Sequence, residues 1–481
     1  MKFPDALLID GRWQTEAGGG RLELIEPATE EPLCEVPAAG KADIDRALQS
    51  AAAAFAKTNW SRRTDRADVL YRIAAGIRAK TDELARLESR NVGKPIGDAL
   101  WEVRAAARCF EYYAGGISRF GGETIPVNAQ GLDYTLRLPL GLVVCIVPWN
   151  FPLLMACWKV APALATGNAV VLKPASLTPL SALALGRVVE EAGVPEGIFQ
   201  VVAGRGSEIG DYLVAHPLVR KIAFTGETAT GSRILKLAAD RIKRVSLELG
   251  GKSPNLIFAD ADVEAAAAAA PLAVFGNAGQ DCCARSRILV ERSVYDRFLE
   301  ALVQSTRQLN IGDPASEATQ VGPLVSASQR QRVERYVQLA KDSRGRILCG
   351  GDRGREPGYF FNPVVVDGLP PDSRVCQEEI FGPLTCVIPF DDEEEAVRLA
   401  NQTEYGLAGS LWTGDLERAL RVAQRVETGV MSVNTNSSVY QEAPFGGFKQ
   451  SGYGRDLGME AMRLYTEIKN VFVALPESEP T

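Results

Sequence analysis

Two cysteines stand side by side in the stretch NAGQDCCARSR, at Cys282 and Cys283. A thiol becomes a useful nucleophile only when a neighbouring group takes its proton or stabilises its charge, and that neighbour is most often histidine. The chain of 481 residues has a single histidine, His216 in VAHPLV, which we expect at a surface helix end. Chemistry at the cysteine pair therefore needs a base of another kind, and a carboxylate is the natural candidate.

The two cysteines are not equivalent, because a residue one position later projects from a different face of any local helix or turn. Free cysteines are most often buried as small apolar residues, and both could have only that structural role. The nine cysteines are scattered and contain no CxxC pair, so we expect neither a disulfide framework nor a zinc site. Reduced thiols in a cytoplasmic compartment fit this usage best.

Composition excludes several classes of partner. A formal net charge of -7 would attract neither nucleic acid nor an anionic membrane surface. No stretch reaches the roughly 20 uninterrupted apolar residues that span a bilayer, and the opening MKFPDALLIDGRW lacks the basic and then apolar order of a signal peptide. Small-molecule ligands and other copies of the chain remain as partners. The length suffices for two or three domains.

The elements that must position the cysteines appear as an alternation of strands and helices. From Gly141 to Gly251, five β-rich runs (LVVCIV, AVVLK, FQVVA, KIAFT and RVSLEL) alternate with amphipathic segments. This pattern predicts a doubly wound, mostly parallel sheet, while residues 42–118 are expected to form long helices. A second alternation runs from SPNLIF through RILVE, PVVVDG and LTCVIPF to GVMSVN. We therefore expect two α/β lobes, with the cysteines near the start of the second.

Two segments fit neither lobe. Residues 121–140 alternate polar and apolar side chains around Asn128 to Gly131, as a projecting β-hairpin does. The tail LYTEIKNVFVAL, residues 464–475, is typical of a terminal strand. Exposed strands of this kind either pair with another subunit or are capped within the monomer. We favour pairing between subunits, in a homodimer or homotetramer.

Three loops at strand ends of the first sheet could bind a ligand, because open α/β sheets bind ligands there. One carries Gly204-x-Gly206 with Gly210 closing the turn, one residue longer than the usual dinucleotide fingerprint. The second, KPAS, places Lys173 at a strand end. The third, FTGE from Phe224, leads into a helix whose N-terminal amides could meet a phosphate. Each loop alone could be only a turn, but together they favour a cofactor site.

Seven segments in one order carry a family resemblance: PWNFP (148–152), LKPAS (172–176), FTGETATG (224–231), LELGGKSP (247–254), FGNAGQDC (275–282), EEIFGP (378–383) and PFGGFKQSG (444–452). They resemble the motifs of the aldehyde dehydrogenase superfamily, and in part those of its betaine- and amino-aldehyde-oxidising members. The resemblance implies the aldehyde dehydrogenase fold: a doubly wound, Rossmann-like NAD(P)-binding domain (1–120 and 141–248), an α/β catalytic domain (249–450), and a small β oligomerisation arm with the C-terminal tail (121–140 and 451–481). It also implies oxidation of a small-molecule aldehyde to the carboxylic acid with NAD or NADP.

The resemblance assigns the catalytic residues. Cys282 would be the nucleophile that forms a thiohemiacetal and then a thioester, and Glu248 the general base for thioester hydrolysis, with a pKa raised by its apolar surroundings. Asn150 and the backbone N–H of Cys282 would stabilise the oxyanion, and Lys159 would take part in proton movement. From the residues alone, Asn150 could instead cap the helix beginning near Pro152, Glu248 could lie at an exposed strand end, and Lys159 could be solvated.

The same motifs imply the cofactor contacts. Lys173 is expected on the adenosine ribose, Glu379 on the nicotinamide ribose, and Phe381 beside the nicotinamide ring. The other expected contacts are Pro148, Trp149, Ser176, Gly206, Gly210, Phe224, Gly226, Glu227, Leu249 and Gly250.

Two positions depart from the family's pattern. Many NAD-preferring members have a glutamate three residues after the lysine, where its charge suits ribose hydroxyls and repels a 2′-phosphate. This chain has Ser176, so NADP is expected to be tolerated or preferred. Glu227 replaces a small hydroxyl residue near the expected pyrophosphate, which argues against direct phosphate contact there.

The expected substrate-pocket residues are Phe151, Met155, Trp158, Ser437, Ser438, Val439 and Phe445. The aromatic ones would form a wall able to meet a cation. Amino-aldehyde-oxidising members, however, carry acids near the positions of Arg104 and Ala105, and this chain does not. A medium-sized aliphatic or aromatic aldehyde is therefore the preferred substrate class.

Two alternatives stay open. One is an acylating relative that passes the acyl group to coenzyme A, whose pattern usually lacks the glutamate found here as Glu248. The other is a catalytically silent structural or binding protein on the same fold. The presence of Cys282, Asn150 and Glu248 argues against this alternative.

Overall fold

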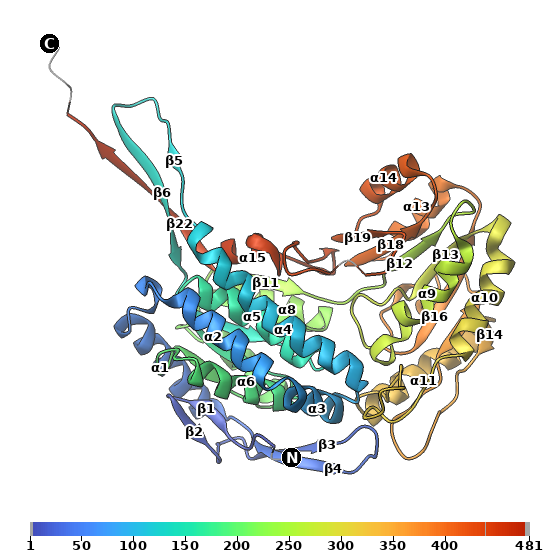
Figure 1. Cartoon of the computed structure of the whole chain (residues 1–481), viewed down its shortest axis with the longest axis horizontal. Coiled ribbons are helices and arrows are strands. Elements are labelled where there is room, and N and C mark those ends of the chain that lie inside the picture. The colour runs from blue at the N-terminus through green and yellow to red at the C-terminus, as the bar shows by residue number, and fades with distance from the viewer. Residues whose placement is uncertain (1–2, 438, 477–481) are drawn as a thin grey trace.

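Two sheets divide the chain into two lobes, from which an arm projects (Figure 1). The structure is a computed structural model that describes residues 3–437 and 439–476. Ser438, expected at the pocket, lies outside the described residues, as do residues 477–481 of the expected tail. Both lobes combine largely parallel strands with helices, so the expected α/β class is confirmed.

The first sheet has the strand order β2-β1-β9-β8-β7-β10-β11-β21. Its central parallel strands are the five predicted runs: β7 (Leu142–Ile146), β8 (Ala169–Lys173), β9 (Phe199–Val201), β10 (Lys221–Thr225) and β11 (Arg244–Glu248). The order reverses between β7 and β10, which leaves a crevice at the carboxyl ends of these strands. The antiparallel edge strands, which the sequence did not predict, are β1 (Leu7–Ile9), β2 (Arg12–Gln14) and β21 (Gly452–Tyr453).

Two groups of helices pack against this sheet. The first group contains α5 (Pro152–Ala165) and α6 (Leu180–Glu191), with α2 (Arg66–Ala79), α3 (Thr81–Val92) and α4 (Ile96–Gly116) packed on them. The second group contains α1 (Lys41–Lys57), α7 (Gly206–Ala215) and α8 (Thr228–Ala239). The long helices predicted within residues 42–118 are therefore confirmed.

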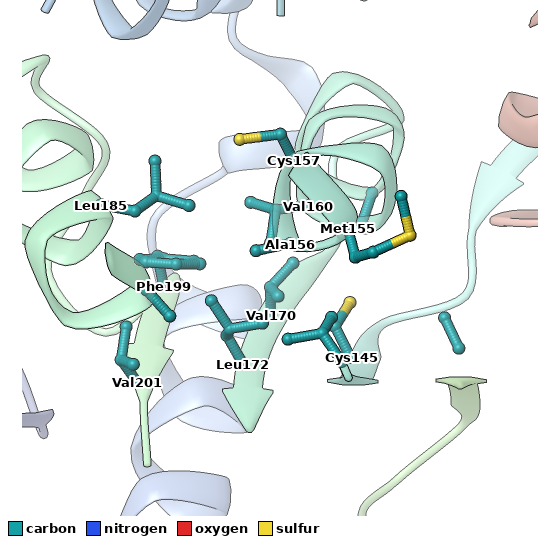
Figure 2. Packing of buried hydrophobic residues seen from close by; sticks show 14 of the residues in the cluster. Cys145, Met155, Ala156, Cys157, Val160, Val170, Leu172, Leu185, Phe199 and Val201 are labelled. Carbon is teal, nitrogen blue, oxygen red and sulfur yellow. The ribbon is translucent and has the colours of Figure 1, made fainter. Parts of the chain in front are cut away.

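Helix α5 is buried along its whole length, because nearly all of its side chains are apolar. In Figure 2, Ala156 and Val160 of this helix face Val170 and Leu172 of β8. All four side chains are fully buried, so their contacts hold the helix firmly on the sheet. This packing also fixes the position of Asn150, just ahead of the helix.

The second sheet has the order β14-β15-β16-β13-β12-β18-β19. Its strands are β12 (Pro254–Ile257), β13 (Arg287–Glu291), β14 (Arg346–Cys349), β15 (Val364–Asp367), β16 (Leu384–Phe390), β18 (Ala408–Trp412) and β19 (Val430–Val433). Only β14 is antiparallel to its neighbour. The helices of this lobe are α9 (Val263–Phe275), α10 (Tyr295–Arg307), α11 (Ala327–Asp342), α12 (Arg374–Gln377), α13 (Glu393–Asn401) and α14 (Leu416–Arg425).

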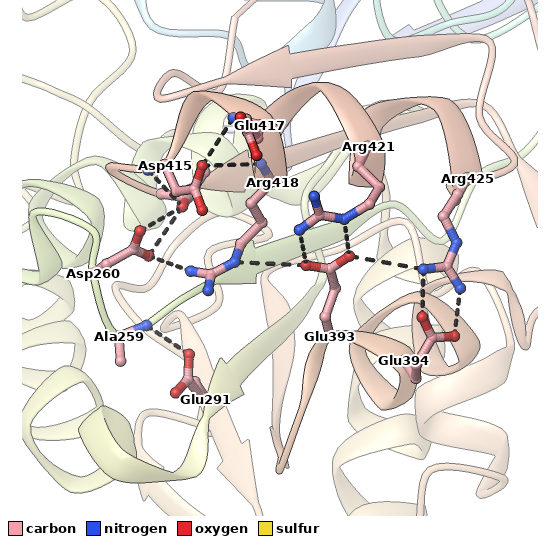
Figure 3. A network of polar contacts seen from close by, with 11 residues as sticks. Ala259, Asp260, Glu291, Glu393, Glu394, Asp415, Glu417, Arg418, Arg421 and Arg425 are labelled. Carbon is pink, nitrogen blue, oxygen red and sulfur yellow. Dashed lines mark hydrogen bonds and ion pairs between the residues drawn. The ribbon is translucent and has the colours of Figure 1, made fainter.

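A network of ion pairs joins α13 to α14 at the surface of the second lobe (Figure 3). Glu393 contacts Arg418 at 3.6 Å, Arg421 at 2.7 Å and Arg425 at 3.8 Å. Arg418 also reaches Asp260 at 2.7 Å. Because these groups are partly exposed, each pair contributes no more than about 1 kcal/mol, and the network mainly orients α14.

The arm is a three-stranded sheet in the order β22-β6-β5. The predicted hairpin is confirmed as β5 (Thr124–Ile125) and β6 (Gly131–Pro139), and the predicted terminal strand as β22 (Thr466–Ala474). The two segments pair with each other within the chain, as the alternative of strands capped within the monomer allowed. The remaining short elements are β3 (Arg21–Ile25), β4 (Pro32–Pro37), β17 (Tyr405–Gly406), β20 (Phe448–Lys449) and α15 (Gly458–Arg463).

Candidate active site

A cleft of about 890 Å³ lies where the two lobes meet. Residues that follow the first sheet's strands line one side, and Gln329, Arg332, Glu379 and Phe381 of the second lobe line another. Of the expected site residues, all except Lys159, Gly210 and the undescribed Ser438 line this cleft. Folding thus gathers motifs that are spread over about 300 residues of sequence into one concave surface, the usual form of a ligand site.

Cys282 and Cys283 lie at the centre of a turn closed by a hydrogen bond from the Ala284 N–H to the Asp281 carbonyl, 3.0 Å. Both side chains are half-buried and both line the cleft. The expectation that Cys283 faces away from Cys282 is therefore wrong, because within this turn both side chains reach the same cleft. A hydrogen bond with the Cys283 side chain, together with burial, raises the pKa of Cys282 well above its usual value.

The loop ahead of this turn is held by Asn277. Its side-chain amide donates to the carbonyl oxygen of Asn150 at 3.1 Å and to that of Gln280 at 3.3 Å. Asn277 and Ala278 have φ values of 50° and 55°, in the left-handed region that alanine rarely adopts. Strain of this kind persists only when the surrounding contacts impose it, so the contacts with Asn150 place the cysteine turn.

Asn150 is itself buried, and its side-chain amide donates to the Gln280 carbonyl at 2.9 Å. The residue that caps α5 is Phe151, and no side chain caps the helix. The alternative that Asn150 is a helix cap is therefore wrong. Its amide points instead toward the backbone that leads into Cys282, as an oxyanion donor would.

A buried ionic cluster supports the start of α5. The carboxylates of Glu88 and Glu102 accept hydrogen bonds from backbone N–H groups in the first turn of the helix, at 3.2 and 3.1 Å. Lys94 forms an ion pair with Glu102 and lies 3.9 Å from the centroid of the Phe151 ring. Acids are favoured at a helix N-terminus. The sequence analysis missed this cluster, although Glu102 falls within the apolar stripe of α4, which is a detectable signal.

Glu248 ends β11 and is buried, so an exposed strand end is excluded. Neither carboxylate oxygen has a hydrogen-bond partner in the structure. Burial, and next the nearby Asp456, raise the pKa of Glu248 well above its usual value, while Lys159 and Arg455 act against this rise. Lys159 lies outside the cleft lining, buried in an ion pair with Asp456 at 2.6 Å, so the alternative of a solvated lysine is also wrong.

Two glycines after Glu248 allow the lobes to approach closely. A Cβ atom on Gly250 would lie 2.5 Å from the Glu379 carboxylate, and one on Gly251 would lie 2.3 Å from the carbonyl oxygen of Cys282. The Gly251 N–H donates to Glu379 at 2.9 Å, and burial raises the pKa of Glu379 to about 7. At Gly251 the neighbour is backbone and only glycine fits, whereas a side chain at Gly250 would displace the Glu379 carboxylate.

The expected cofactor residues have the chemistry to hold a dinucleotide. Lys173, at the end of β8, is buried, and burial lowers its pKa to about 8. The rings of Trp149 and Phe381 meet edge to face with centroids 5.1 Å apart. A buried ammonium, the Glu379 carboxylate and an aromatic pair suit ribose hydroxyls and a planar ring. Gly210 lies inside α7 and is not part of the lining.

Two lining residues on α4, Asp98 and Trp101, were missed by the sequence analysis. Both are exposed toward solvent. Arg104 and Ala105, the positions at which acids were sought, do not line the cleft. Asp98 supplies an acid at this side of the cleft instead. Its spacing of three from Trp101 places both on one helix face, a signal that the sequence contained.

One family matches nearly the whole chain. Residues 13–471 match the model described as "Aldehyde dehydrogenase family". The chain belongs to the aldehyde dehydrogenase family. It is an oxidoreductase that acts on aldehydes. In the described residues, no helix is long and apolar enough to cross a membrane.

Similar proteins carry related names. Betaine aldehyde dehydrogenase of Bacillus subtilis is 40% identical over 473 residues, which cover 97% of this chain and 96% of that protein. A crystal structure of a betaine aldehyde dehydrogenase point mutant from Staphylococcus aureus, in complex with NAD+ and with a BME-modified cysteine, is 37% identical with a TM-score of 0.96, covering 98% of each chain. A mutant aldehyde dehydrogenase from Bacillus cereus is 42% identical with a TM-score of 0.96, covering 98% of this chain and 96% of that one.

The contact between Gly251 and Cys282 yields a prediction. Gly251→Ala should lower kcat/KM by about 100-fold or more, because the new Cβ must push the cysteine turn away, and displacements near 1 Å cost about that much. Gly97→Ala is the matched control, since a Cβ there meets no atom within 4 Å. Steady-state kinetics of both variants, with thermal melting to confirm folding, check the prediction. Equal activity in the two variants would contradict it.

Proposed function

We propose that this aldehyde dehydrogenase oxidises its substrate to the carboxylic acid through a thiohemiacetal and a thioester on Cys282, with Glu248 as the general base. The observation that carries the proposal is the convergence of three groups in one cleft: a half-exposed thiol, the Asn150 amide, and a buried Glu248 carboxylate without a hydrogen-bond partner. This combination meets the needs of nucleophilic acyl chemistry without histidine.

In the first step the sulfur of Cys282 attacks the aldehyde carbon, and the thiol proton passes to solvent in the open cleft. The oxyanion that forms accepts hydrogen bonds from the Asn150 side chain and the Cys282 backbone N–H. Loss of one such donor typically costs about 3 kcal/mol of barrier. The buried surroundings strengthen both bonds, because few waters compete with them.

When bound, a nicotinamide cofactor would supply the acceptor for the hydride that leaves the substrate carbon. Lys173, Glu379 and Phe381 would hold this cofactor. The ammonium, carboxylate and aromatic ring of these side chains suit the groups of a dinucleotide. Glu248 then takes a proton from the water that attacks the thioester. Lys159, paired with Asp456 close to Glu248, offers a route by which this proton moves on.

For the substrate, we favour a medium-sized aliphatic or aromatic aldehyde. Trp158 and Phe445 meet edge to face, 5.1 Å between centroids, and form an apolar wall with Phe151. A cationic aldehyde is the second candidate. It is favoured by Asp98, which supplies a negative charge at the cleft, and by the betaine aldehyde dehydrogenases among the similar proteins.

We also propose the domain division given by the family's pattern, with the NAD(P)-binding domain at 1–120 and 141–248, the catalytic domain at 249–450, and the arm and tail at 121–140 and 451–481. The arm's strand β22 ends its sheet, and its Ile468 and Phe472 are 61% and 45% exposed. These side chains support a homodimer or homotetramer. The nine free cysteines support a cytoplasmic location.

An aldehyde panel tests the reaction and ranks the substrates. Enzyme, NAD or NADP and one aldehyde are mixed, and the absorbance of the reduced cofactor is followed with and without coenzyme A. We expect turnover without coenzyme A, fastest with hexanal or benzaldehyde and slower with betaine aldehyde. Turnover that requires coenzyme A would support the acylating alternative, and no turnover under any condition would support the silent one.

The cysteine variants should differ sharply. Cys282→Ala should abolish turnover because it removes the nucleophile. Cys283→Ala should retain most of it, because that sulfur forms no bond to substrate. Initial rates at saturating aldehyde and cofactor give the ranking, with circular dichroism as a check on folding. The reverse ranking would overturn the assignment of Cys282.

Glu248→Gln separates acylation from hydrolysis. The variant should release a single burst of reduced cofactor and then turn over about 10²- to 10⁴-fold more slowly than wild type. In the wild-type enzyme the base acts as a carboxylate, and its pKa is raised. The kcat should therefore fall as pH drops through a value above the usual glutamate range. Stopped-flow and pH-rate profiles measure both effects, and a variant with wild-type steady-state rate would refute the role.

Cofactor choice depends on Ser176. We expect NADP to be used with a kcat/KM at least comparable to that for NAD. A preference for NAD of a hundredfold, about 2.7 kcal/mol, would refute this. Ser176→Glu should shift the ratio toward NAD by about tenfold or more, because a carboxylate repels the 2′-phosphate. Ser176→Gln, of the same size without the charge, is the matched control and should shift the ratio much less.

A further inference from the structure

The proton that leaves the Cys282 thiol needs an acceptor within reach of the sulfur, and the carboxylate of Asp281 lies beside it. One carboxylate oxygen of Asp281 and the sulfur atoms of Cys282 and Cys283 all lie within 4.8 Å of one another. All three side chains are half-buried and line the cleft. The sequence analysis gave Asp281 no role, because it singled out only the two cysteines of this stretch. A carboxylate and the candidate nucleophile therefore share one wall of the cleft.

The turn itself holds this carboxylate in place. The Cys283 N–H donates to Oδ1 of Asp281 at 2.8 Å, the hydrogen bond of a local Asx turn. Burial raises the pKa of Asp281 above its usual value. That hydrogen bond, the cations Arg285 and Lys94, and a hydrogen bond with the Cys282 thiol act against the rise. The carboxylate is thus more basic than an exposed aspartate and is oriented toward the thiol.

We propose that Asp281 is a second catalytic carboxylate, which takes the thiol proton of Cys282 as the sulfur attacks the aldehyde and then passes it to solvent. This inference rests on the proposed role of Cys282 as the nucleophile. In the step, the S–H bond breaks as the S–C bond forms, and the carbonyl electron pair moves onto the oxygen beside Asn150. The proton ends on Asp281. Its transfer to water in the open cleft restores the carboxylate.

Three other groups near Cys282 are poorer acceptors for this proton. The Cys283 side chain forms a hydrogen bond with the thiol, but a thiol sulfur is a weak acceptor and an ionised carboxylate a strong one. Glu379 raises the pKa of Cys282 less than Asp281 does. Glu248 has a pKa well above its usual value because it is buried, so it keeps its own proton to a higher pH. Two carboxylates in different surroundings thus divide two proton transfers between them.

The variant Asp281→Asn removes the base and keeps the turn, because the asparagine oxygen can still accept from the Cys283 N–H. It is made in the Glu248→Gln enzyme, in which the burst of reduced cofactor is followed by stopped flow. At pH 7 the added change should lower the burst rate constant by about 10²-fold or more. Asp313→Asn in the same background is the matched control. Asp313 accepts an equivalent hydrogen bond from the Ala315 N–H at 2.9 Å, outside the cleft lining. Equal burst rate constants in the two double variants would overturn the proposal.

The pH dependence of the burst separates a base from a merely structural residue. Without Asp281, attack requires free thiolate, whose concentration rises about tenfold per pH unit below the thiol pKa. The deficit caused by Asp281→Asn should therefore shrink by about tenfold for each pH unit. The titratable and charged groups that face the Cys282 thiol or the Asp281 carboxylate are Cys283, Glu379, Arg285 and Lys94. All four are the same in both proteins, so the ratio of the rate constants reports Asp281 alone. A deficit that stays constant with pH would contradict the role of a base.

A measurement on the resting enzyme, without turnover, should show a change of the opposite sign. After the Cys283 hydrogen bond and burial, the charge of Asp281 is a further cause that raises the pKa of Cys282. Asp281→Asn alone should therefore shift the alkylation of Cys282 by iodoacetamide to lower pH, as followed by mass spectrometry of the tryptic peptide 253–285. A distorted turn does not explain a thiol that ionises more easily and yet attacks aldehyde more slowly. An alkylation midpoint that is unchanged or higher would overturn the contact.

Failure of the proposed function would give a different pattern. If Cys282→Ala keeps its turnover, Cys282 is not the nucleophile, and the role of Asp281 falls with it. If Cys282→Ala is inactive and the burst of Glu248→Gln is not slowed by Asp281→Asn, the thioester mechanism stands. Only the proton transfer to Asp281 is then refuted.

Discussion

The close backbone contact between Gly251 and Cys282 is the constraint on which the active site depends. It joins the segment that follows β11 to the loop between α9 and β13, and no Cβ atom fits between them. Because β11 runs directly from Glu248 into Leu249 and the two glycines, the base, the cysteine turn and the Glu379 carboxylate are all placed by one short segment. The two lobes are therefore in direct backbone contact beside the cysteine turn.

Buried charge is arranged around the apolar helix α5. At its start, Glu88 and Glu102 accept backbone hydrogen bonds, and along its length Lys159 pairs with Asp456. Isolated charges in such surroundings are costly, but paired and hydrogen-bonded ones are tolerated. Glu248 lies beside these groups without a hydrogen-bond partner of its own. The structure thus gives each supporting group at least one hydrogen bond or ion pair and leaves the candidate base without one.

Sequence alone predicted the five central strands and most of the site, because those residues lie in contiguous motifs at strand ends. It failed where contact depends on distant segments. Asp456 meets Lys159 across 297 positions of sequence, and β22 pairs with β6 through backbone bonds that no side-chain pattern encodes. The orientation of Cys283 was mispredicted because the prediction assumed that consecutive side chains point in different directions, as they do in a helix or strand. Residues in a turn do not follow that periodicity. Asp98 was overlooked because an acid at a helix start is usually solvated.

The covalent step can be observed by trapping the acyl group. Glu248→Gln is mixed with aldehyde and cofactor, quenched in acid after the burst, and digested with trypsin. If the account is right, the peptide of residues 253–285 gains the mass of the acyl group, and fragmentation places it on Cys282. An acyl group on Cys283, or a complete burst with no acylated peptide, would contradict a thioester mechanism at Cys282.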